Sequence, residues 1–352
     1  MNRYGFRIKE RLIGLDHPPF VIAEMSGNHN QSLERALAIV EAAAKAGVHA
    51  VKLQTYTADT MTIDMRENEF LIEDPQSLWC GCSLYELYKR AHTPWEWHEI
   101  IFKRCEELGL ICFSTPFDET AIDFLESLDC PCYKIASFEN TDLPLIHKAA
   151  STGKPIIISI GMANVAEIDE ATRTIRECEC NDIILLKCTS TYPASPADSN
   201  LMTLPHMREM FNCEVGISDH TLGIGVSVAA VALGATVIEK HFTIGRSDGG
   251  VDAAFSLEPD EMAALVIESE RAWQALGAVN YQAGEREKKS LVHRRSLYIV
   301  QDMKAGDALT RENLRAIRPG LGMPPKYIDI VLGRRIRRNA VRGTPLTWDI
   351  VG

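Results

Sequence analysis

Charged and hydroxyl-bearing side chains stand at the ends of short apolar runs along this sequence. They are Glu24, Lys52, Gln54, Lys134, Ser137, Ser159, Ser218, His220, Glu239 and His241. Two lysines among serines supply the ammonium and hydroxyl donors that a small phosphate or carboxylate anion needs. His220 and His241 end neighbouring runs. They either bind one divalent metal, with oxygen ligands completing its shell, or are hydrogen-bonded structural histidines.

An alternation of strands and helices indicates how these side chains meet. Eight apolar runs have the length and composition of strands, over residues 20–25, 49–54, 110–114, 132–137, 155–159, 182–188, 214–218 and 236–241. Helical segments separate them, and Ser32 and Gly47 are expected to cap and end the first. This order predicts an α/β fold, the (β/α)₈ TIM barrel, whose catalytic groups lie at the carboxyl ends of the strands. A doubly wound sheet is the alternative, but no G-x-G-x-x-G follows the first strand.

The chain also contains two stretches outside this repeat. Residues 55–93 show no clear period, and a connection of that length is usually functional or holds small elements of its own. Near residue 285 the composition changes to arginines, glycine turns and short apolar runs. We therefore expect a barrel domain over 1–284, with a polar connector from about residue 277, and a small β-rich domain over 285–352.

Composition and charge exclude several classes of protein. The 352 residues are 46% hydrophobic and 24% charged, which excludes intrinsic disorder. The net charge of −11 argues against binding to nucleic acid or to an anionic membrane, so an anion must be held by a local cationic pocket. There is no apolar centre of a secretory signal near the amino terminus and no run long enough for a membrane span. We expect a cytoplasmic protein whose ten cysteines are thiols.

Five motifs resemble those of the sialic acid synthase family. They are FVIAEMSGNHN at residues 20–30, AVKLQT at 50–55, YKIAS at 133–137, GISDHTL at 216–222 and IEKHF at 238–242. The similarity covers nearly the whole chain, and residues 293–349 resemble the family's antifreeze-protein-like (SAF) domain. The resemblance implies a transferase of nonulosonate biosynthesis that condenses phosphoenolpyruvate with an acylated amino sugar, using Mn²⁺ or Mg²⁺.

Within the family, residues 84–88, 92–98, 138–142 and 246–252 look most like the pseudaminic acid synthases, whose acceptor is a 2,4-diacetamido-2,4,6-trideoxy-altrose. N-acetylneuraminate and legionaminic acid synthases are the alternatives. Two positions depart from the usual pattern: Ile160 stands where the family has threonine, and Gln31 where it has glycine.

The resemblance also implies a role for each site residue. Phosphoenolpyruvate would contact Lys52, Lys134, Ser137, Ser159 and Ser218. The metal would be held by His220 and His241. Glu24 matches a position near the acceptor sugar, and either Glu24 or metal-bound water would move protons. The acceptor sugar would lie near Gln54, Glu139, Tyr192 and Asp252, and near Arg318 from the small domain of the other subunit in a domain-swapped homodimer.

Three other interpretations stay open at this point. Lys52 or Lys134 could form a Schiff base, as in lysine-dependent aldolases. The small domain could be an ice- or carbohydrate-binding module on a barrel scaffold. It could also cover the barrel of its own chain as an intrachain lid.

Overall fold

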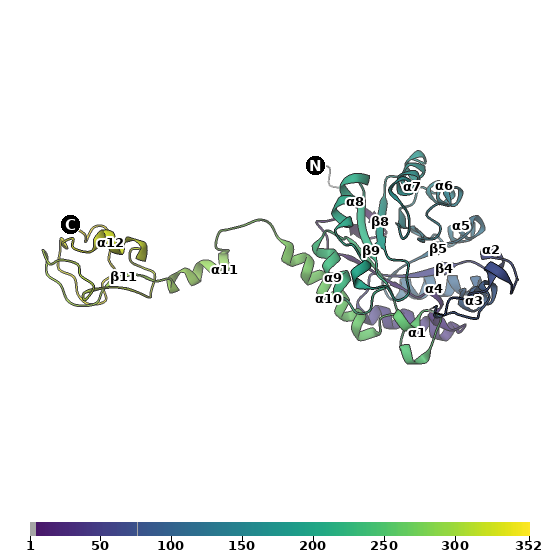
Figure 1. Ribbon diagram of the computed structural model, residues 1–352, viewed down its shortest axis with the longest axis horizontal. Helices are drawn as coiled ribbons and strands as arrows, with labels where there is room; N and C mark the ends of the chain where they lie inside the picture. Colours follow the sequence, from purple (N-terminus) through teal and green to yellow (C-terminus); the bar gives the residue numbers. More distant parts are fainter. Residues whose placement is uncertain (1–4, 76) are drawn as a thin grey trace. The chain divides into compact units, whose positions relative to one another are not determined.

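Eight parallel strands close into a barrel in the computed structural model, which describes residues 5–75 and 77–352 (Figure 1). The strands are β3 (Phe20–Glu24), β4 (Ala50–Thr55), β5 (Ile111–Pro116), β6 (Tyr133–Ile135), β7 (Ile156–Ser159), β8 (Ile183–Cys188), β9 (Glu214–Ser218) and β10 (Val237–His241). They pair in sequence order, and β10 closes the barrel against β3. The predicted (β/α)₈ barrel is confirmed.

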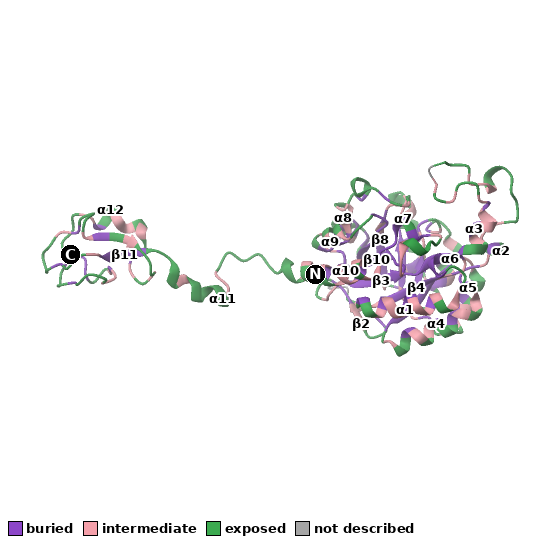
Figure 2. Ribbon diagram, turned by 90° about the horizontal axis from the view of Figure 1, so that it is seen from below, coloured by how far each residue is buried: buried purple, intermediate pink, exposed green. Residues whose placement is uncertain are grey.

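Helices follow the strands and cover the outside of the barrel. They are α1 (Leu33–Ala46), α4 (Trp95–Glu107), α5 (Glu119–Glu126), α6 (Leu143–Ala150), α7 (Val165–Glu177), α8 (Thr203–Phe211), α9 (Gly225–Ala232) and α10 (Pro259–Leu276). Figure 2 shows the strands as buried and the outward faces of the helices as exposed. The ends of α1 are the predicted ones, because the Ser32 side chain accepts from the Arg35 amide and Gly47 is left-handed with φ 82°.

The stretch between β4 and α4 holds small elements of its own. They are α2 (Ala58–Met61), a 3₁₀ turn η2 (Asn68–Phe70) and α3 (Leu84–Ala91). Before the barrel, β1 (Phe6–Ile8) and β2 (Arg11–Ile13) form an antiparallel hairpin that the sequence analysis did not predict. Ile8 and Ile13 of this hairpin are buried in the barrel's hydrophobic core.

The chain divides into two compact units, Met1–Gly277 and Ala278–Gly352. The second unit contains α11 (Glu285–Lys288), the antiparallel pair β11 (Ser296–Ile299) and β12 (Leu314–Ile317), and α12 (Ile328–Val331). Isolated β-bridges connect its loops, and it has a separate core that includes Leu297, Ile299 and Leu346. The domain bounds expected from the sequence, 1–284 and 285–352 with a polar connector from about residue 277, stay predictions.

The described part of the chain has neither a helix suited to span a membrane nor a disulfide bond. None of the helices in the described ranges has the length and apolar character needed to span a membrane. All ten cysteines are free thiols.

Candidate active site

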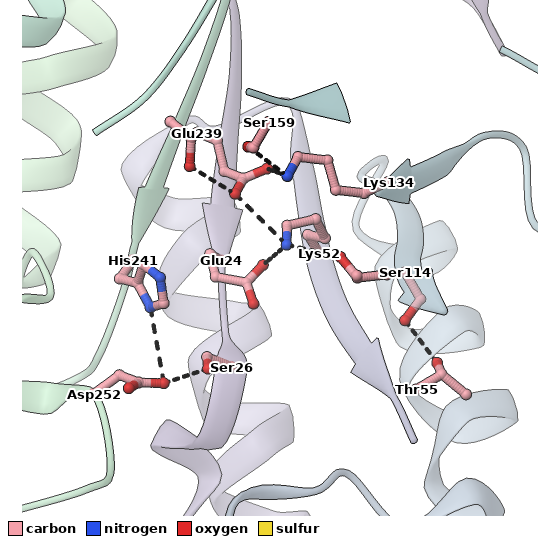
Figure 3. Close-up of polar contacts among 12 residues, drawn as sticks. Glu24, Ser26, Lys52, Thr55, Ser114, Lys134, Ser159, Glu239, His241 and Asp252 are labelled. Carbon is pink, nitrogen blue, oxygen red and sulfur yellow. Dashed lines mark hydrogen bonds and ion pairs between the residues drawn. The ribbon is translucent and has the colours of Figure 1, made fainter. Parts of the chain in front are cut away.

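Four charged side chains form a buried cluster at the carboxyl ends of the barrel strands (Figure 3). The strand register places Glu24 of β3 beside Lys52 of β4 and beside His241 of β10. Lys52 Nζ lies 2.7 Å from Glu24 Oε2 and 3.6 Å from Glu239 Oε1. Lys134 Nζ lies 3.8 Å from Glu239 Oε2. Glu239 therefore bridges the two ammonium groups.

The two carboxyl groups of this cluster differ in basicity. Burial raises the pKa of Glu24 to about 7, although Lys52 acts in the opposite direction. Burial also acts to raise the pKa of Glu239, but Lys134 and Lys52 outweigh it and hold that pKa below its usual value. At neutral pH Glu24 is thus the group able to take up or release a proton, while Glu239 stays a carboxylate.

The pKa values of the two lysines are displaced in opposite directions. Burial acts to lower the pKa of Lys52, but Glu239 and Glu24 overcome it and raise that pKa. For Lys134 burial prevails over Glu239, so its pKa is lowered. Lys52 is therefore the more firmly protonated of the two.

Hydroxyl groups complete the surroundings of the cluster. Lys134 Nζ donates to Ser159 Oγ at 2.7 Å, and Ser218 Oγ donates to Glu239 Oε1 at 3.1 Å. Lys134 and Ser159 come from the adjacent strands β6 and β7, and Ser218 and Glu239 from β9 and β10. The structure thus brings together the two lysines and two of the three serines predicted to bind an anion.

The third serine, Ser137, lies against the loop that follows β7. Its Oγ accepts a hydrogen bond from Ser190 Oγ at 2.9 Å. In the β7 loop, Gly161 has φ +39°, and a Cβ there would lie 2.4 Å from Ser137 Cβ, so only glycine permits this approach. Ile160 is buried, and its carbonyl accepts from Asn140 Nδ2 at 3.0 Å. The residue that departs from the family's pattern therefore packs inward.

The other departure, Gln31, lies in the loop after β3. Asn30 and Gln31 have left-handed φ values of 51° and 55°. The Gln31 amide donates to the carbonyl of Arg90 at 3.0 Å and to that of His92 at 2.7 Å. A glycine would adopt this backbone with less strain, but glutamine ties the loop to the end of α3.

Two imidazoles face each other at the ends of β9 and β10, with ring centroids 5.4 Å apart. His220 Nδ1 lies 3.0 Å from the carbonyl oxygen of Thr189, which only accepts, so Nδ1 carries a hydrogen and, in the neutral ring, the free lone pair is on Nε2. His241 Nδ1 is buried without a hydrogen-bond partner, 4.0 Å from Asp252 Oδ2. Burial holds the pKa of His241 well below its usual value. Burial acts to lower the pKa of His220 as well, but interactions with Cys188, the Thr189 carbonyl and Glu239 together outweigh it and the pKa is raised.

The fit of this pair to a metal ion depends on these donor atoms. Among residues 5–75 and 77–352, no three His, Cys, Asp or Glu side chains stand together as a ligand set. His220 and His241 are therefore the two side chains proposed as metal ligands. The unpartnered nitrogen of His241 and the tautomer of His220 fit such a two-residue site.

A cavity of about 400 Å³ opens beside the imidazole of His241. Of the predicted acceptor-site residues, it is lined by Gln54, Glu139, Tyr192 and Asp252. Burial raises the pKa of Glu139 to about 7, and its Oε2 atom has no hydrogen-bond partner. The Tyr192 ring centroid lies 4.5 Å from that of His220.

Aromatic side chains form much of the remaining cavity wall. They are Tyr56, Trp79, Tyr88, Phe117 and Phe138. The Trp79 indole is fixed by a hydrogen bond of 3.0 Å from Nε1 to the carbonyl of Val251. The stretch between β4 and α4 is therefore a wall of the site rather than a plain connection.

Sequence reasoning missed two parts of this site. Glu239 was noticed at a strand end but received no role. Its position two residues before His241, and so on the same face of β10, was the available signal. Trp79 was missed because it lies in a stretch without periodicity. Arg318 lies in the second unit, and its place at a partner's barrel stays a prediction.

Comparisons with known proteins match both units of the chain. Residues 39–281 match the NeuB family and residues 294–351 match the SAF domain. The chain is 42% identical to the pseudaminic acid synthase of Campylobacter jejuni, covering 94% of this chain and 96% of that protein. It is 41% identical to the pseudaminic acid synthase of Helicobacter pylori, covering 94% and 97%.

More distant relatives share the same architecture. An N,N'-diacetyllegionaminic acid synthase of Legionella pneumophila is 38% identical, covering 94% of each protein. The crystal structure of an N-acetylneuraminic acid synthetase from Leptospira borgpetersenii, in complex with citrate, superimposes with a TM-score of 0.74 at 30% identity, over 82% of this chain and 95% of that one. Family matches over both units confirm the resemblance found in the motifs, and the chain belongs to the NeuB family, with a SAF domain at its carboxyl end.

Proposed function

We propose that this chain is a pseudaminic acid synthase. It condenses phosphoenolpyruvate and water with 2,4-diacetamido-2,4,6-trideoxy-β-L-altropyranose, in its open aldehyde form, to give pseudaminic acid and phosphate. The observation that carries the proposal is the identity of 41–42% over 94% of the chain with two proteins of that name. The buried pair of lysines beside two imidazoles supports it, since an anion and an aldehyde must meet in this reaction.

Lys52 and Lys134 are the groups that bind phosphoenolpyruvate. Its phosphate and carboxylate are anions, and the two ammonium groups share only one firmly ionised carboxylate, that of Glu239. The Ser159 hydroxyl holds Lys134 at 2.7 Å and so fixes the direction of its charge. These contacts position C3 of the enolpyruvate and stabilise phosphate as it leaves.

The reaction forms one carbon–carbon bond and one carbon–oxygen bond, the latter from water, and breaks the carbon–oxygen bond to phosphate. C3 of phosphoenolpyruvate attacks the aldehyde carbon of the sugar, whose oxygen takes up a proton. Water adds to the electron-poor C2 that results, and phosphate departs by cleavage of the C2–O bond, which leaves the keto group of the product. Glu24, with a pKa of about 7, accepts and returns protons in these steps.

His220 and His241 are the residues that would hold a divalent ion, Mn²⁺ or Mg²⁺. When bound, such an ion supplies Lewis acidity that polarises the carbonyl of the sugar. The chain contributes the neutral imidazole of His241 and the oriented imidazole of His220, and its aromatic wall excludes bulk water.

The cavity wall supports a deoxy sugar as acceptor. Tyr56, Phe117 and Phe138 are apolar surfaces against which a methyl group packs better than a hydroxyl. The alternative function is synthesis of N-acetylneuraminate or legionaminic acid. The 38% identity with a legionaminic acid synthase supports this alternative.

The test is incubation with phosphoenolpyruvate, Mn²⁺ and each acceptor sugar, with phosphate release and product mass as readouts. We expect the diacetamido-trideoxy-altrose to be preferred over N-acetylmannosamine by roughly 10–200-fold in kcat/KM, the range for one apolar contact. Equal values for both sugars would contradict the pseudaminic assignment. A lack of phosphate release with every sugar would contradict the synthase itself.

The alternative activity is that of a lysine-dependent aldolase. It needs a neutral, nucleophilic lysine, and the lowered pKa of Lys134 would favour one. Borohydride reduction in the presence of pyruvate traps an imine on lysine, and the synthase route forms none. We expect no trapped adduct. Turnover of the sugar by the barrel also distinguishes the synthase from an ice- or carbohydrate-binding module.

We further propose that the working unit is a homodimer in which each SAF domain supplies Arg318 to the partner's barrel. The arginine-rich composition of residues 293–349 in an otherwise acidic chain supports this arrangement, as does the polar connector after residue 277. The cytoplasmic location expected from the sequence stays a prediction.

Mixing the Arg318→Ala and Lys134→Ala variants tests the exchange. In a swapped heterodimer one site carries both defects and the other carries none, so activity returns from two nearly inactive parents. With an intrachain lid every site keeps one defect, and no recovery follows subunit exchange.

A further inference from the structure

A second buried ion pair lies directly beside the two imidazoles in the sequence. Asp219 precedes His220, Lys240 precedes His241, and Lys240 Nζ lies 2.9 Å from Asp219 Oδ2. The side chains of this pair are 0% and 1% exposed. Neither residue lines the cavity, and the proposed reaction uses neither.

The position of Lys240 follows from the alternation of side chains along β10. Glu239 and His241 point to the site, so Lys240 between them points to the other face of the strand. From there its ammonium group reaches Asp219 and also donates to the carbonyl of Thr221. Lys240 therefore ties the end of β10 to the loop that carries His220.

Asp219 stabilises the loop that carries His220 through hydrogen bonds from Thr221 in the same loop and from Ser227. Its Oδ1 accepts from the Thr221 amide at 2.9 Å and from the Thr221 hydroxyl at 2.7 Å. Its Oδ2 accepts from Ser227 Oγ of α9 at 2.6 Å, besides Lys240. The carboxylate thus has four donors, which fix the backbone on both sides of His220.

We propose that the Asp219–Lys240 pair is a positioning device that sets the separation and orientation of His220 and His241. The inference rests on the proposed function, because the two rings are there the residues that hold the divalent ion. Neither Asp219 nor Lys240 touches substrate or metal, and both act through the backbone of the neighbouring histidine. Their removal is expected to lower the affinity for the metal and to leave Lys52 and Lys134, which bind phosphoenolpyruvate, in place.

The energetic cost of the pair supports a positioning role. Two charges lose their hydration when they are buried, and apolar residues of similar volume usually stabilise a core at least as well. A purely structural contact between β9 and β10 needs no charges here. The four hydrogen bonds that Asp219 accepts instead fix the positions of the neighbouring histidines. A metal site requires its ligands to be placed within a fraction of an ångström.

The chain offers a matched control at the opposite end of the same strands. Arg208 of α8 pairs with Glu214 at the start of β9 at 2.7 Å, and Glu214 also accepts from Thr236 Oγ1 just before β10. This pair likewise joins β9 to its surroundings, but far along the strand from the imidazoles. Arg208→Met should cost stability without affecting the metal site.

The experiment measures Mn²⁺ affinity by electron paramagnetic resonance and phosphoenolpyruvate affinity by calorimetry on chelator-treated protein. We expect Lys240→Met and Asp219→Asn to weaken Mn²⁺ binding by roughly 10–100-fold, the usual effect of losing a residue that orients a ligand. Phosphoenolpyruvate affinity should be unchanged. Thr221→Val, which removes one hydroxyl donor, should weaken Mn²⁺ binding less, and it provides the test if the charge variants do not fold.

Imidazole ¹H–¹⁵N spectra of the metal-free protein give a readout that does not depend on the metal. The resonances of His220 and His241 should move in Lys240→Met and stay in place in Arg208→Met. Equal Mn²⁺ affinity in the wild type and Lys240→Met, or equal losses in Lys240→Met and Arg208→Met, would overturn the inference. A wild type that binds no Mn²⁺ would instead overturn the proposed metal site, and the ring resonances would still decide whether the pair positions the histidines.

Discussion

Replacing Glu139 with glutamine should make the protein more stable at high pH. The carboxyl group lies in the turn after β6, lines the cavity, and has one buried oxygen without a hydrogen-bond partner. Burial raises its pKa to about 7 from the ordinary value of 4.5, against the lowering effect of Lys134. Glutamine has the same shape as the protonated acid and never ionises.

The magnitude follows from the difference between the folded and unfolded pKa values. A folded pKa above the unfolded one contributes stability that is fully present below pH 4.5 and is lost as the pH rises through about 7. The difference between the two pKa values, 4.5 and about 7, corresponds to roughly 3 kcal/mol, because a tenfold change in proton affinity is worth 1.36 kcal/mol. Most of that loss falls between about pH 5 and pH 8 in the wild type, and none of it in the variant.

Urea unfolding at several pH values measures this difference. The stability of Glu139→Gln relative to the wild type should rise by about 2–3 kcal/mol between pH 5 and pH 8. Glu99→Gln, which removes an exposed carboxylate from α4, is the control and should follow the wild type. Parallel stability curves for Glu139→Gln and the wild type would refute the argument that burial of this carboxyl group dominates its ionisation.

Three further predictions concern the reaction. His220→Ala and His241→Ala should each abolish turnover and keep the circular dichroism of the wild type; near-normal rates without added metal would contradict the metal assignment. Ser159→Ala should raise the KM for phosphoenolpyruvate roughly 10-fold or more, since it removes a hydrogen bond to the charged Lys134, and an unchanged KM would show that the hydroxyl does not orient the lysine. Chelation should stop turnover and Mn²⁺ should restore it, whereas activity that persists in excess chelator would exclude a required divalent ion.

The barrel was predictable because its strands repeat a local pattern. Each apolar run is a few residues long, most of the runs end in a polar side chain, and caps such as Ser32 and Gly47 mark the first helix. The β1–β2 hairpin was not predictable in this way. Its strands have only three residues each, and their burial depends on contacts with the barrel core rather than on their own pattern.

The candidate site was predictable where one strand end determines a residue's place. Lys52 and His241 follow from alternation within β4 and β10 alone. The position of Glu239 between the two lysines depends on how the barrel closes. Closure pairs β10 with β3, the last and first strands of the repeat, and no local pattern in the sequence marks that pairing. Trp79 reaches the cavity only through the folding of a stretch without period, so no local signal marks it.

The cluster of Glu24, Lys52, Lys134 and Glu239 is explained by function better than by stability. The interior of a barrel is filled with layers of branched apolar side chains, and four buried charges in their place cost hydration energy that mutual pairing only partly returns. Pairing is also incomplete, because Glu24 Oε1 accepts no hydrogen bond and Glu239 Oε2 has only the 3.8 Å contact with Lys134. A chain selected for stability alone would satisfy or remove these atoms. The proposed function accounts for these atoms: the phosphoenolpyruvate anion would complete the network by adding the negative charge that the two lysines lack.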